Sequence, residues 1–503
     1  MKLEPLLSDI EKRQIAQWKY KVSDNSITTK ILTPLWNWLL KNLISFDVAP
    51  NILTLSGLLC LIYSWYLTDQ YIDIYPRAIT FAAIILVYAY QTFDALDGKQ
   101  ARRIKNSTPL GELFDHICDN VGVIFLILSL TNILGINNHI FPWFLINLIQ
   151  LGFLTEHVKA VDSGVLVFET FAGPGEAIFL ATVAMVARHF FDISFLNSLG
   201  MYPYLIGLYV ISLTRTLYHI NQLSNKHWDS KLRLVTSIMI RIVPTVLIIF
   251  GLKTDVTFMN QLADGLILSV LTTETILIKM SQSTVNQWTT LLMGISLFDE
   301  VLTIAVVIFY YLYLLSELAN YLNIHIFTVN QNVYLDGVFD LCHEGHVRIF
   351  EEAMKHGNRL VVGVIPDEAV ESYKRKPYMS YSERKRLVSL WVRDHQVIEA
   401  APLTGITEEF IQKHNIHVLV YSAEYDDPNN GFYHHYDVPR RMGIAKPIPR
   451  TEGISTSQLI KRIVERSKET EKTLKDKTEI EDKTEVKDVL EVKDVLGNQE
   501  VEV

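Results

Sequence analysis

The chain has 503 residues and carries 46 lysine and arginine residues against 55 aspartate and glutamate residues, for a formal charge of −9. This length exceeds that of one ordinary globular core, so we expect two or more domains. Residues 467–503 alone account for −5 of the charge, and the weakly acidic remainder argues against a nucleic-acid partner.

Long apolar runs dominate the chain up to about residue 330. The segment 31–44 is short and mixes Trp36 and Trp38 with lysines, which is typical of a helix lying in the membrane interface. The residues before it are charged throughout and show no cleavable signal, so we expect insertion to rely on internal spans. Several later runs approach the ~20 residues needed to cross a bilayer, and we expect about eight to ten spans. The clearest runs are 52–67, 78–93, 121–134, 140–154, 203–217, 234–252 and 301–315.

An acidic cluster follows the second of these runs. Asp94-Ala-Leu-Asp97-Gly98-Lys-Gln-Ala101-Arg102 is separated by eight residues from Gly111-Glu-Leu-Phe-Asp115-His-Ile-Cys-Asp119. The aspartates are three apart in the first segment and four apart in the second, so each pair lies on one helix face. Two facing helices would bring four carboxylates together, and divalent cations are their natural partners near the end of an apolar span. Such cations could bridge a pyrophosphate and stabilise the charge of phosphoryl transfer.

An alternative is that these aspartates cap helices or pair with the basic residues of a cytosolic loop, Lys99, Arg102, Arg103 and Lys105. The spacing, however, matches the CDP-alcohol phosphotransferase signature D-x-x-D-G-x-x-A-R-x8-G-x3-D-x3-D at every fixed position. Over about residues 18–328 the chain resembles the eukaryotic choline/ethanolamine phosphotransferases. The matching blocks are 20–26, 49–54, 93–103 and 109–116.

The resemblance implies a bundle of about ten transmembrane helices with a metal site and a nucleotide site. It implies that Mg²⁺ or Mn²⁺ is held by Asp94, Asp97, Asp115 and Asp119. Asp119 would also be the base for the acceptor hydroxyl. The CDP moiety would contact Asn51, Gly98 and Arg102, and the guanidinium fork suits phosphate. Three further polar residues beside apolar runs stay open between a helix-terminal or interfacial placement and a catalytic role: Glu156, His157 and Glu176.

From Asn332 onward, short apolar runs alternate with charge, as in a soluble α/β domain. The pattern predicts a strand at 333–335, a loop, a helix to about His356 and a second strand at 359–365, which together form a βαβ unit. The loop brings His343-Glu-Gly-His346 to the helix N-terminus, where backbone amides favour phosphate. Two imidazoles there can donate hydrogen bonds to a triphosphate, and direct in-line attack is the simplest mechanism.

By themselves, the two histidines could be surface residues. Residues 332–466, however, resemble choline- and ethanolamine-phosphate cytidylyltransferases in the blocks 334–341, 343–346, 371–377 and 450–456. The resemblance implies that His343 and His346 stabilise the transition state at the α-phosphate and that Lys374 neutralises phosphate charge. It implies CTP binding by Arg450, Ser455 and Thr456. Thr456 also suits the N-cap of a helix over 458–466.

The headgroup is less well defined by the sequence. A quaternary ammonium favours an aromatic cage, and faces could come from Tyr421, Tyr425, Tyr433 and Tyr436. Leu403 stands where the choline-specific pattern would have tryptophan, so phosphoethanolamine competes with phosphocholine.

Two other features, the cysteines and the C-terminal tail, indicate no functional site. Cys60, Cys118 and Cys342 form no CxxC spacing, so neither a zinc site nor a disulfide framework is indicated, and a cytosol-facing enzyme fits. The tail repeats Glu-Val-Lys-Asp-Val-Leu at 485–490 and 491–496, a biased composition that we expect to be disordered.

The combined prediction is a polytopic helical membrane bundle over 1–330, a Rossmann-like nucleotidyltransferase domain over 331–466 and a charged tail over 467–503. It would convert CTP and phosphocholine or phosphoethanolamine to a CDP-alcohol and pyrophosphate. It would then transfer the phospho-headgroup to diacylglycerol, with release of CMP. We expect the soluble domain to lie in the cytosol and the bundle in a membrane such as the endoplasmic reticulum, with membrane lipid as a partner. The sequence also allows a homodimer.

Three rival interpretations remain. The chain could retain only one of the two activities, or it could be a scaffold that keeps the folds without turnover. It could also be an ion-coupled polytopic transporter whose acidic cluster binds ions and whose soluble domain senses nucleotide.

Overall fold

The computed structural model describes residues 5–136, 138–168, 170, 173–191, 201–253, 255–373, 375–392, 396–403, 405–451 and 453–472. The chain divides into two compact units, Met1–Gln331 and Asn332–Val503. The first is almost entirely helical and the second is α/β, so the predicted fold class is confirmed.

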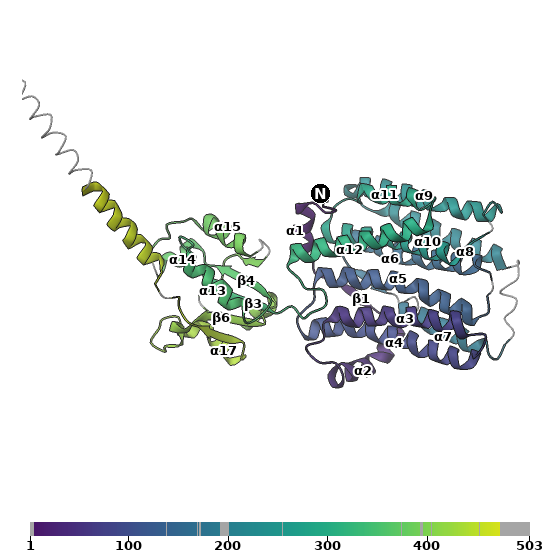
Figure 1. Cartoon of the computed structure of the whole chain (residues 1–503), viewed down its shortest axis with the longest axis horizontal. Coiled ribbons are helices and arrows are strands. Elements are labelled where there is room, and N and C mark those ends of the chain that lie inside the picture. The colour runs from purple at the N-terminus through teal and green to yellow at the C-terminus, as the bar shows by residue number, and fades with distance from the viewer. Residues whose placement is uncertain are drawn as a thin grey trace, which may run out of the picture. The chain divides into compact units, whose positions relative to one another are not determined.

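The long helices of the first unit run roughly alongside one another (Figure 1). The helices of this unit, short ones included, are α1 (Asp9–Gln17), α2 (Ile27–Asn42), α3 (Pro50–Tyr71), α4 (Pro76–Arg103), α5 (Pro109–Ile133), α6 (Ile140–Ser163), α7 (Pro174–Ala187), α8 (Tyr202–Gln222), α9 (Trp228–Ile249), α10 (Phe258–Ser281), α11 (Gln287–Ile295) and α12 (Glu300–Leu322). The short strands β1 (Val22–Asp24) and β2 (Leu166–Phe168) pair in parallel.

Within the described residues, six helices are long and apolar enough to cross a membrane. They are Pro50–Tyr71, Pro76–Arg103, Pro109–Ile133, Asn225–Ile249, Phe258–Ser281 and Glu300–Leu322. α5 and α10 are 83% and 94% buried in their apolar windows, so they form the centre of the bundle. The outer helices expose large apolar side chains such as Phe81 and Leu312, a surface that a bilayer would cover. The chain is an integral membrane protein.

This number is smaller than the eight to ten spans expected from the sequence. The predicted spans at 140–154 and 203–217 do form helices, α6 and α8, but neither is among the six. α6 carries the polar side chains Asn147, Gln150 and His157, which are buried in the bundle. Polar groups that face protein lower the mean hydropathy of a helix without preventing it from crossing a bilayer.

A tight connection between α4 and α5 positions the acidic segments. Pro109 occupies the first turn of α5, and the Thr108 side chain accepts a hydrogen bond from Gly111 N at 3.0 Å. α4 ends at Arg103, and Lys105 adopts a left-handed φ of 53° that reverses the chain. The last turns of α4 and the first turns of α5 are therefore neighbours, and these turns contain all four aspartates.

The second unit contains a five-stranded parallel sheet of order β5-β4-β3-β6-β7. The strands are β3 (Asn332–Gly337), β4 (Arg359–Val364), β5 (Val397–Ile398), β6 (Val418–Ser422) and β7 (Ala445–Ile448). The helices are α13 (Glu344–Met354), α14 (Asp367–Glu371), α15 (Tyr381–Trp391), α16 (Glu408–Lys413) and α17 (Asp437–Arg441), and Figure 1 shows the strands among them.

Alternate residues of β3 serve two cores, one on each face of the sheet. Val333 and Leu335 pack with α13 and α15, whereas Tyr334 packs with α16 and α17. The central strand β3 has β4 on one side and β6 on the other, so the strand order reverses at its carboxyl end. In open parallel sheets this is where ligands bind.

A further helix covers residues 456–472. Residues 467–472 were expected to belong to a disordered tail, and this was wrong for them. Lysine and glutamate dominate this stretch and are good helix formers, so the helix continues past the predicted boundary. The rest of the predicted tail lies outside the described residues.

Candidate active sites

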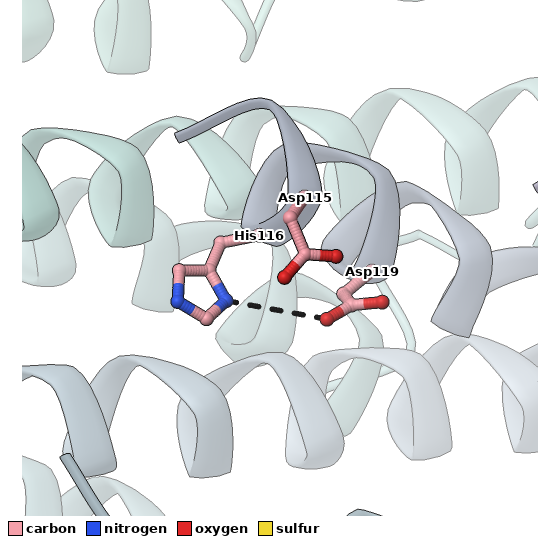
Figure 2. Close-up of side chains that lie close together, drawn as sticks. All are labelled: Asp115, His116 and Asp119. Atoms are coloured by element: carbon pink, nitrogen blue, oxygen red, sulfur yellow. Dashed lines mark ion pairs between the residues drawn. The ribbon is translucent and has the colours of Figure 1, made fainter. Parts of the chain in front are cut away.

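The four aspartates of the acidic cluster meet between α4 and α5. One ligand atom each from Asp94, Asp97 and Asp115 lies within 4.8 Å of the others, and the same holds for Asp115, His116 and Asp119. Figure 2 shows the second group projecting from α5, with His116 Nδ1 4.0 Å from Asp119 Oδ2. The structure therefore brings together all four residues that the sequence selected.

Hydrogen-bond donors restrain part of this cluster. Thr54 Oγ1 on α3 donates to Asp97, and the Tyr90 hydroxyl on α4 donates to Asp119 Oδ1 at 2.8 Å. In contrast, Asp115 Oδ1 is buried and has no hydrogen-bond partner among the described residues. An orphaned buried carboxylate oxygen among three further carboxylates is costly unless a cation binds there. The residues fit a divalent cation held by oxygen and one imidazole nitrogen.

His116, Thr54 and Tyr90 were not selected from the sequence. His116 directly follows Asp115 and Thr54 lies in a matching block, but neither belongs to the acidic spacing. His116 is buried, and its Nε2 has no hydrogen-bond partner among the described residues. Only the packing of α3 and α4 against α5 places Thr54 and Tyr90 at the cluster.

The three residues expected to contact CDP lie near the cluster. Asn51 is buried at the start of α3, and its Nδ2 donates to Ile326 O at 3.0 Å. Gly98 lies beside the guanidinium of the exposed Arg102. A Cβ at Gly98 would be 3.3 Å from Arg102 Nη1, so glycine leaves room for that side chain.

The three residues left open in this unit have separate surroundings. Glu156 pairs with Lys159 at 2.7 Å and with Arg215 at 2.9 Å, which is a surface ion-pair arrangement. Glu176 accepts from Thr28 N at 2.9 Å and so satisfies the first turn of α2. Only His157 approaches the cluster, with its ring 4.8 Å from that of His116.

The loop after β3 and the first turn of α13 hold His343 and His346 of the second unit. His343 is the N-cap of α13, where its Nδ1 accepts from Gly345 N at 3.1 Å. His346 Nδ1 accepts from His343 N at 3.3 Å, and the two rings stack with centroids 4.0 Å apart. Burial lowers the pKa of His343, and burial with the neighbouring His343 lowers the pKa of His346 to about 4. Both imidazoles are therefore neutral near pH 7, with Nδ1 accepting and Nε2 carrying the proton.

A cavity of about 390 Å³ opens at the carboxyl end of β3. Its polar lining comes from Asp336, Asp340, His346, Arg375, His435, Arg450, Ser455, Thr456 and Ser457. The predicted CTP contacts Arg450, Ser455 and Thr456 thus line one cavity with His346. Thr456 Oγ1 lies 3.4 Å from His343 Nε2, so His343 contacts the part of the cavity lining that Ser455 and Thr456 form.

One expected detail at this wall was wrong. Gln458 N donates to Ser455 Oγ at 3.2 Å and the helix begins at 456, so Ser455 is the N-cap rather than Thr456. Both residues carry hydroxyls that can cap a helix, and only the start of the helix distinguishes them.

Lys374 lies outside the described residues. Its neighbour Arg375 lines the cavity and lies 3.7 Å from Asp340, a residue that the sequence reasoning did not single out. Asp340 also accepts from Tyr378 N and Met379 N at 3.1 and 3.0 Å. The Asp340 carboxylate therefore contacts the segment 375–379 at three residues.

The aromatic residues of the cavity differ from those expected. Tyr421 and Tyr433 are not part of its lining, and their rings lie 5.1 and 4.5 Å from the guanidinium of Arg440. Tyr425 and Tyr436 do line it, together with Phe339, Tyr373 and Phe432. Among these rings lies Asp336, whose carboxylate accepts from Tyr436 OH at 3.2 Å. A carboxylate surrounded by aromatic faces suits a cationic ligand.

Comparison with known families identifies two matches along this chain. The family described as CDP-alcohol phosphatidyltransferase matches residues 47–187, which include the acidic cluster. The family described as cytidylyltransferase-like matches residues 334–462, which include both histidines and the cavity.

Several curated proteins are similar to part of this chain. The uncharacterized CDP-alcohol phosphatidyltransferase class-I family protein 2 of Dictyostelium discoideum is 38% identical over 174 residues, which cover 32% of this chain and 41% of that protein. Choline/ethanolaminephosphotransferase 2 of Arabidopsis thaliana is 45% identical over 109 residues, covering 21% and 28%. Cholinephosphotransferase 1 of Xenopus laevis is 35% identical over 127 residues, covering 24% and 31%. The chain thus spans less than half the length of these relatives.

Proposed function

We propose that this chain, which joins a CDP-alcohol phosphatidyltransferase domain to a cytidylyltransferase-like domain, makes a CDP-alcohol from CTP and then transfers its phospho-headgroup to diacylglycerol. The observation that carries the proposal is the presence of both sites on one chain. A nucleotidyl-transfer cavity would produce the compound that a carboxylate cluster in a membrane bundle would consume. We propose domain limits of 1–330 and 331–466, with residues 467–503 as a tail without a catalytic role.

In the first reaction, a phosphate oxygen of phosphocholine or phosphoethanolamine attacks the α-phosphorus of CTP. The bond from this phosphorus to the β-phosphate oxygen breaks, and pyrophosphate leaves. The Nε2–H groups of His343 and His346 donate to the phosphate oxygens on which charge develops, because each Nδ1 is already engaged by a backbone N–H. Arg450, Ser455 and Thr456 bind CTP along the same wall, and Lys374 neutralises phosphate charge.

The headgroup would lie in the aromatic part of the cavity. Asp336 and the rings of Tyr425 and Tyr436 suit the positive charge that phosphocholine and phosphoethanolamine share. Leu403 lines the cavity where the choline-specific pattern has tryptophan, which supports phosphoethanolamine as the competing substrate.

In the second reaction, the hydroxyl oxygen of diacylglycerol attacks the β-phosphorus of the CDP-alcohol. The bond from that phosphorus to the oxygen shared with the α-phosphate breaks, and CMP leaves. Asp119, oriented by Tyr90, accepts the hydroxyl proton, while Arg102, Asn51 and Gly98 bind the CDP moiety.

Asp94, Asp97, Asp115 and Asp119 would hold Mg²⁺ or Mn²⁺ for this second reaction. When bound, the cation neutralises pyrophosphate charge and stabilises the leaving group. Both reactions draw on soluble nucleotides, so we place the second unit and the carboxylate end of the bundle in the cytosol, at an endomembrane such as the endoplasmic reticulum.

Two substitutions test the proposal in the purified full-length protein. His346→Ala should abolish pyrophosphate release from CTP and phospho-alcohol, while CMP release from added CDP-alcohol and diacylglycerol continues. Asp119→Asn should have the reverse effect. Loss of both activities in either folded variant would refute two independent sites. A wild-type protein that accumulates the substrates in vesicles without releasing pyrophosphate or CMP would instead favour the transporter.

A further inference from the structure

A buried ion pair lies one helical turn from the carboxylate cluster. Lys279 on α10 is 1% exposed, and its Nζ lies 2.7 Å from Glu112 Oε1 on α5. The other oxygen of Glu112 accepts from Trp18 Nε1 at 2.7 Å. Glu112 precedes Asp115 by three residues and His116 by four, so all three share one side of α5. Glu112 is thus held on both oxygens next to the proposed site.

The same lysine contacts an aromatic layer that reaches His116. Its Nζ lies 5.5 Å from the ring centroid of Trp18 and 5.7 Å from that of Tyr20. Tyr20 packs edge-on against His116 at 5.9 Å, and His157 packs edge-on against His116 at 4.8 Å. The imidazole that faces Asp119 therefore contacts two rings, one of which lies against Lys279.

The segment that supplies Trp18 and Tyr20 is held by a short strand pair. β1 begins two residues after Tyr20 and pairs with β2, with Val22 opposite Leu166. Neither this segment nor α10 belongs to the matched residues 47–187, so the ion pair connects the matched core to elements outside it.

Packing alone does not explain why the pair is ionic. A buried salt bridge is often no more stabilising than apolar residues of the same volume, because both charges lose their hydration. Ionisable groups within apolar spans are costly and commonly mark a functional site. The position of Lys279, beside both the first turns of α5 and the Tyr20–His116 contact, indicates what it does.

We propose that Lys279 is a positioning residue for headgroup transfer, acting through Glu112 and Tyr20 to hold His116 beside Asp119. This inference rests on the proposed function of the first unit. Because Lys279 acts on the alignment of the site and touches no residue assigned to CDP, its loss should lower kcat for CMP release and leave KM for the CDP-alcohol nearly unchanged.

The test uses full-length Lys279→Met and Lys279→Arg with added CDP-alcohol and diacylglycerol. Lys279→Met should lower kcat at least tenfold with KM changed less than twofold, and Lys279→Arg should recover a large part of kcat because it keeps the charge. Lys12→Met is the matched control. Lys12 forms a buried pair with Glu317 at 2.7 Å in the same bundle, where neither residue belongs to the proposed site. It should lower thermal stability without changing kcat per folded molecule.

A double substitution protects the test against misfolding, since Glu112→Gln with Lys279→Met leaves no unpaired charge. If Lys279 acts through Glu112, kcat of the double variant should be no lower than that of the worse single variant. Equal kcat in Lys279→Met and Lys12→Met, no recovery in Lys279→Arg, or additive losses would each overturn the inference. These results would leave the proposed function intact, whereas a wild-type protein that releases no CMP would overturn both.

Discussion

Replacement of Tyr90 by phenylalanine removes one hydroxyl from the carboxylate cluster. That hydroxyl donates to Asp119 Oδ1 at 2.8 Å from a neighbouring helix, and the change leaves the ring in place. A hydrogen bond to a charged group contributes about 1.5–3 kcal/mol, and about 1.4 kcal/mol corresponds to a tenfold change in rate, so kcat should fall roughly 10- to 150-fold. The expectation assumes that Asp119 must keep its orientation while it accepts the hydroxyl proton.

The assay measures CMP release from CDP-alcohol and diacylglycerol, and pyrophosphate release from CTP in the same preparation. Pyrophosphate release should be unchanged, because it depends on the second unit. Tyr63→Phe is the matched control, since Tyr63 is exposed on α3 and should not alter either rate. Full CMP release by Tyr90→Phe, or an equal fall in both activities, would refute the role assigned to Asp119.

Three further expectations concern the second unit and its link to the first. A fragment beginning near Asn330 should be soluble and release pyrophosphate without lipid; an aggregated or inactive fragment beside an active full chain would contradict the proposed boundary. The pKa of His346 is lowered from 6.5 to about 4, so between these two pH values the unfolded chain binds a proton that the folded chain does not. The free energy of unfolding should therefore fall as the pH falls from 6.5 to about 4. Denaturant titrations at several pH values should show that the free energy of unfolding depends less steeply on pH in His346→Gln. An unchanged dependence on pH would contradict the buried neutral imidazole. Since a short tether gives an effective concentration of roughly mM, labelled lipid formation should partly resist an excess of unlabelled CDP-alcohol. Equal dilution of label in fused and separated units would exclude such coupling.

The residues predicted best were those whose spacing alone determines their position. Asp94 and Asp97, like Asp115 and Asp119, fall on one helix face by periodicity, and the short α4–α5 connection then brings the pairs together. The loop with His343 and His346 followed from a strand, a turn and a helix in sequence. In both cases local geometry was sufficient.

Contacts between residues distant in sequence depend on tertiary packing and could not be predicted from spacing. Tyr90 reaches Asp119 and Lys279 reaches Glu112 only because helices distant in sequence pack together. The expected aromatic cage was partly wrong because Arg440 packs on Tyr421 and Tyr433, and no spacing rule reports that competition. The number of spans stays a prediction, because an apolar run does not reveal whether its polar residues face lipid or protein.

The central claim is tested most directly by giving the purified full-length protein CTP, diacylglycerol and phosphocholine or phosphoethanolamine labelled in the headgroup, and measuring labelled phospholipid. We predict labelled phospholipid with release of both pyrophosphate and CMP, and its loss in His346→Ala unless CDP-alcohol is supplied. Labelled CDP-alcohol without labelled lipid, or no product from either headgroup while added CDP-alcohol is consumed, would contradict a chain that carries out both steps.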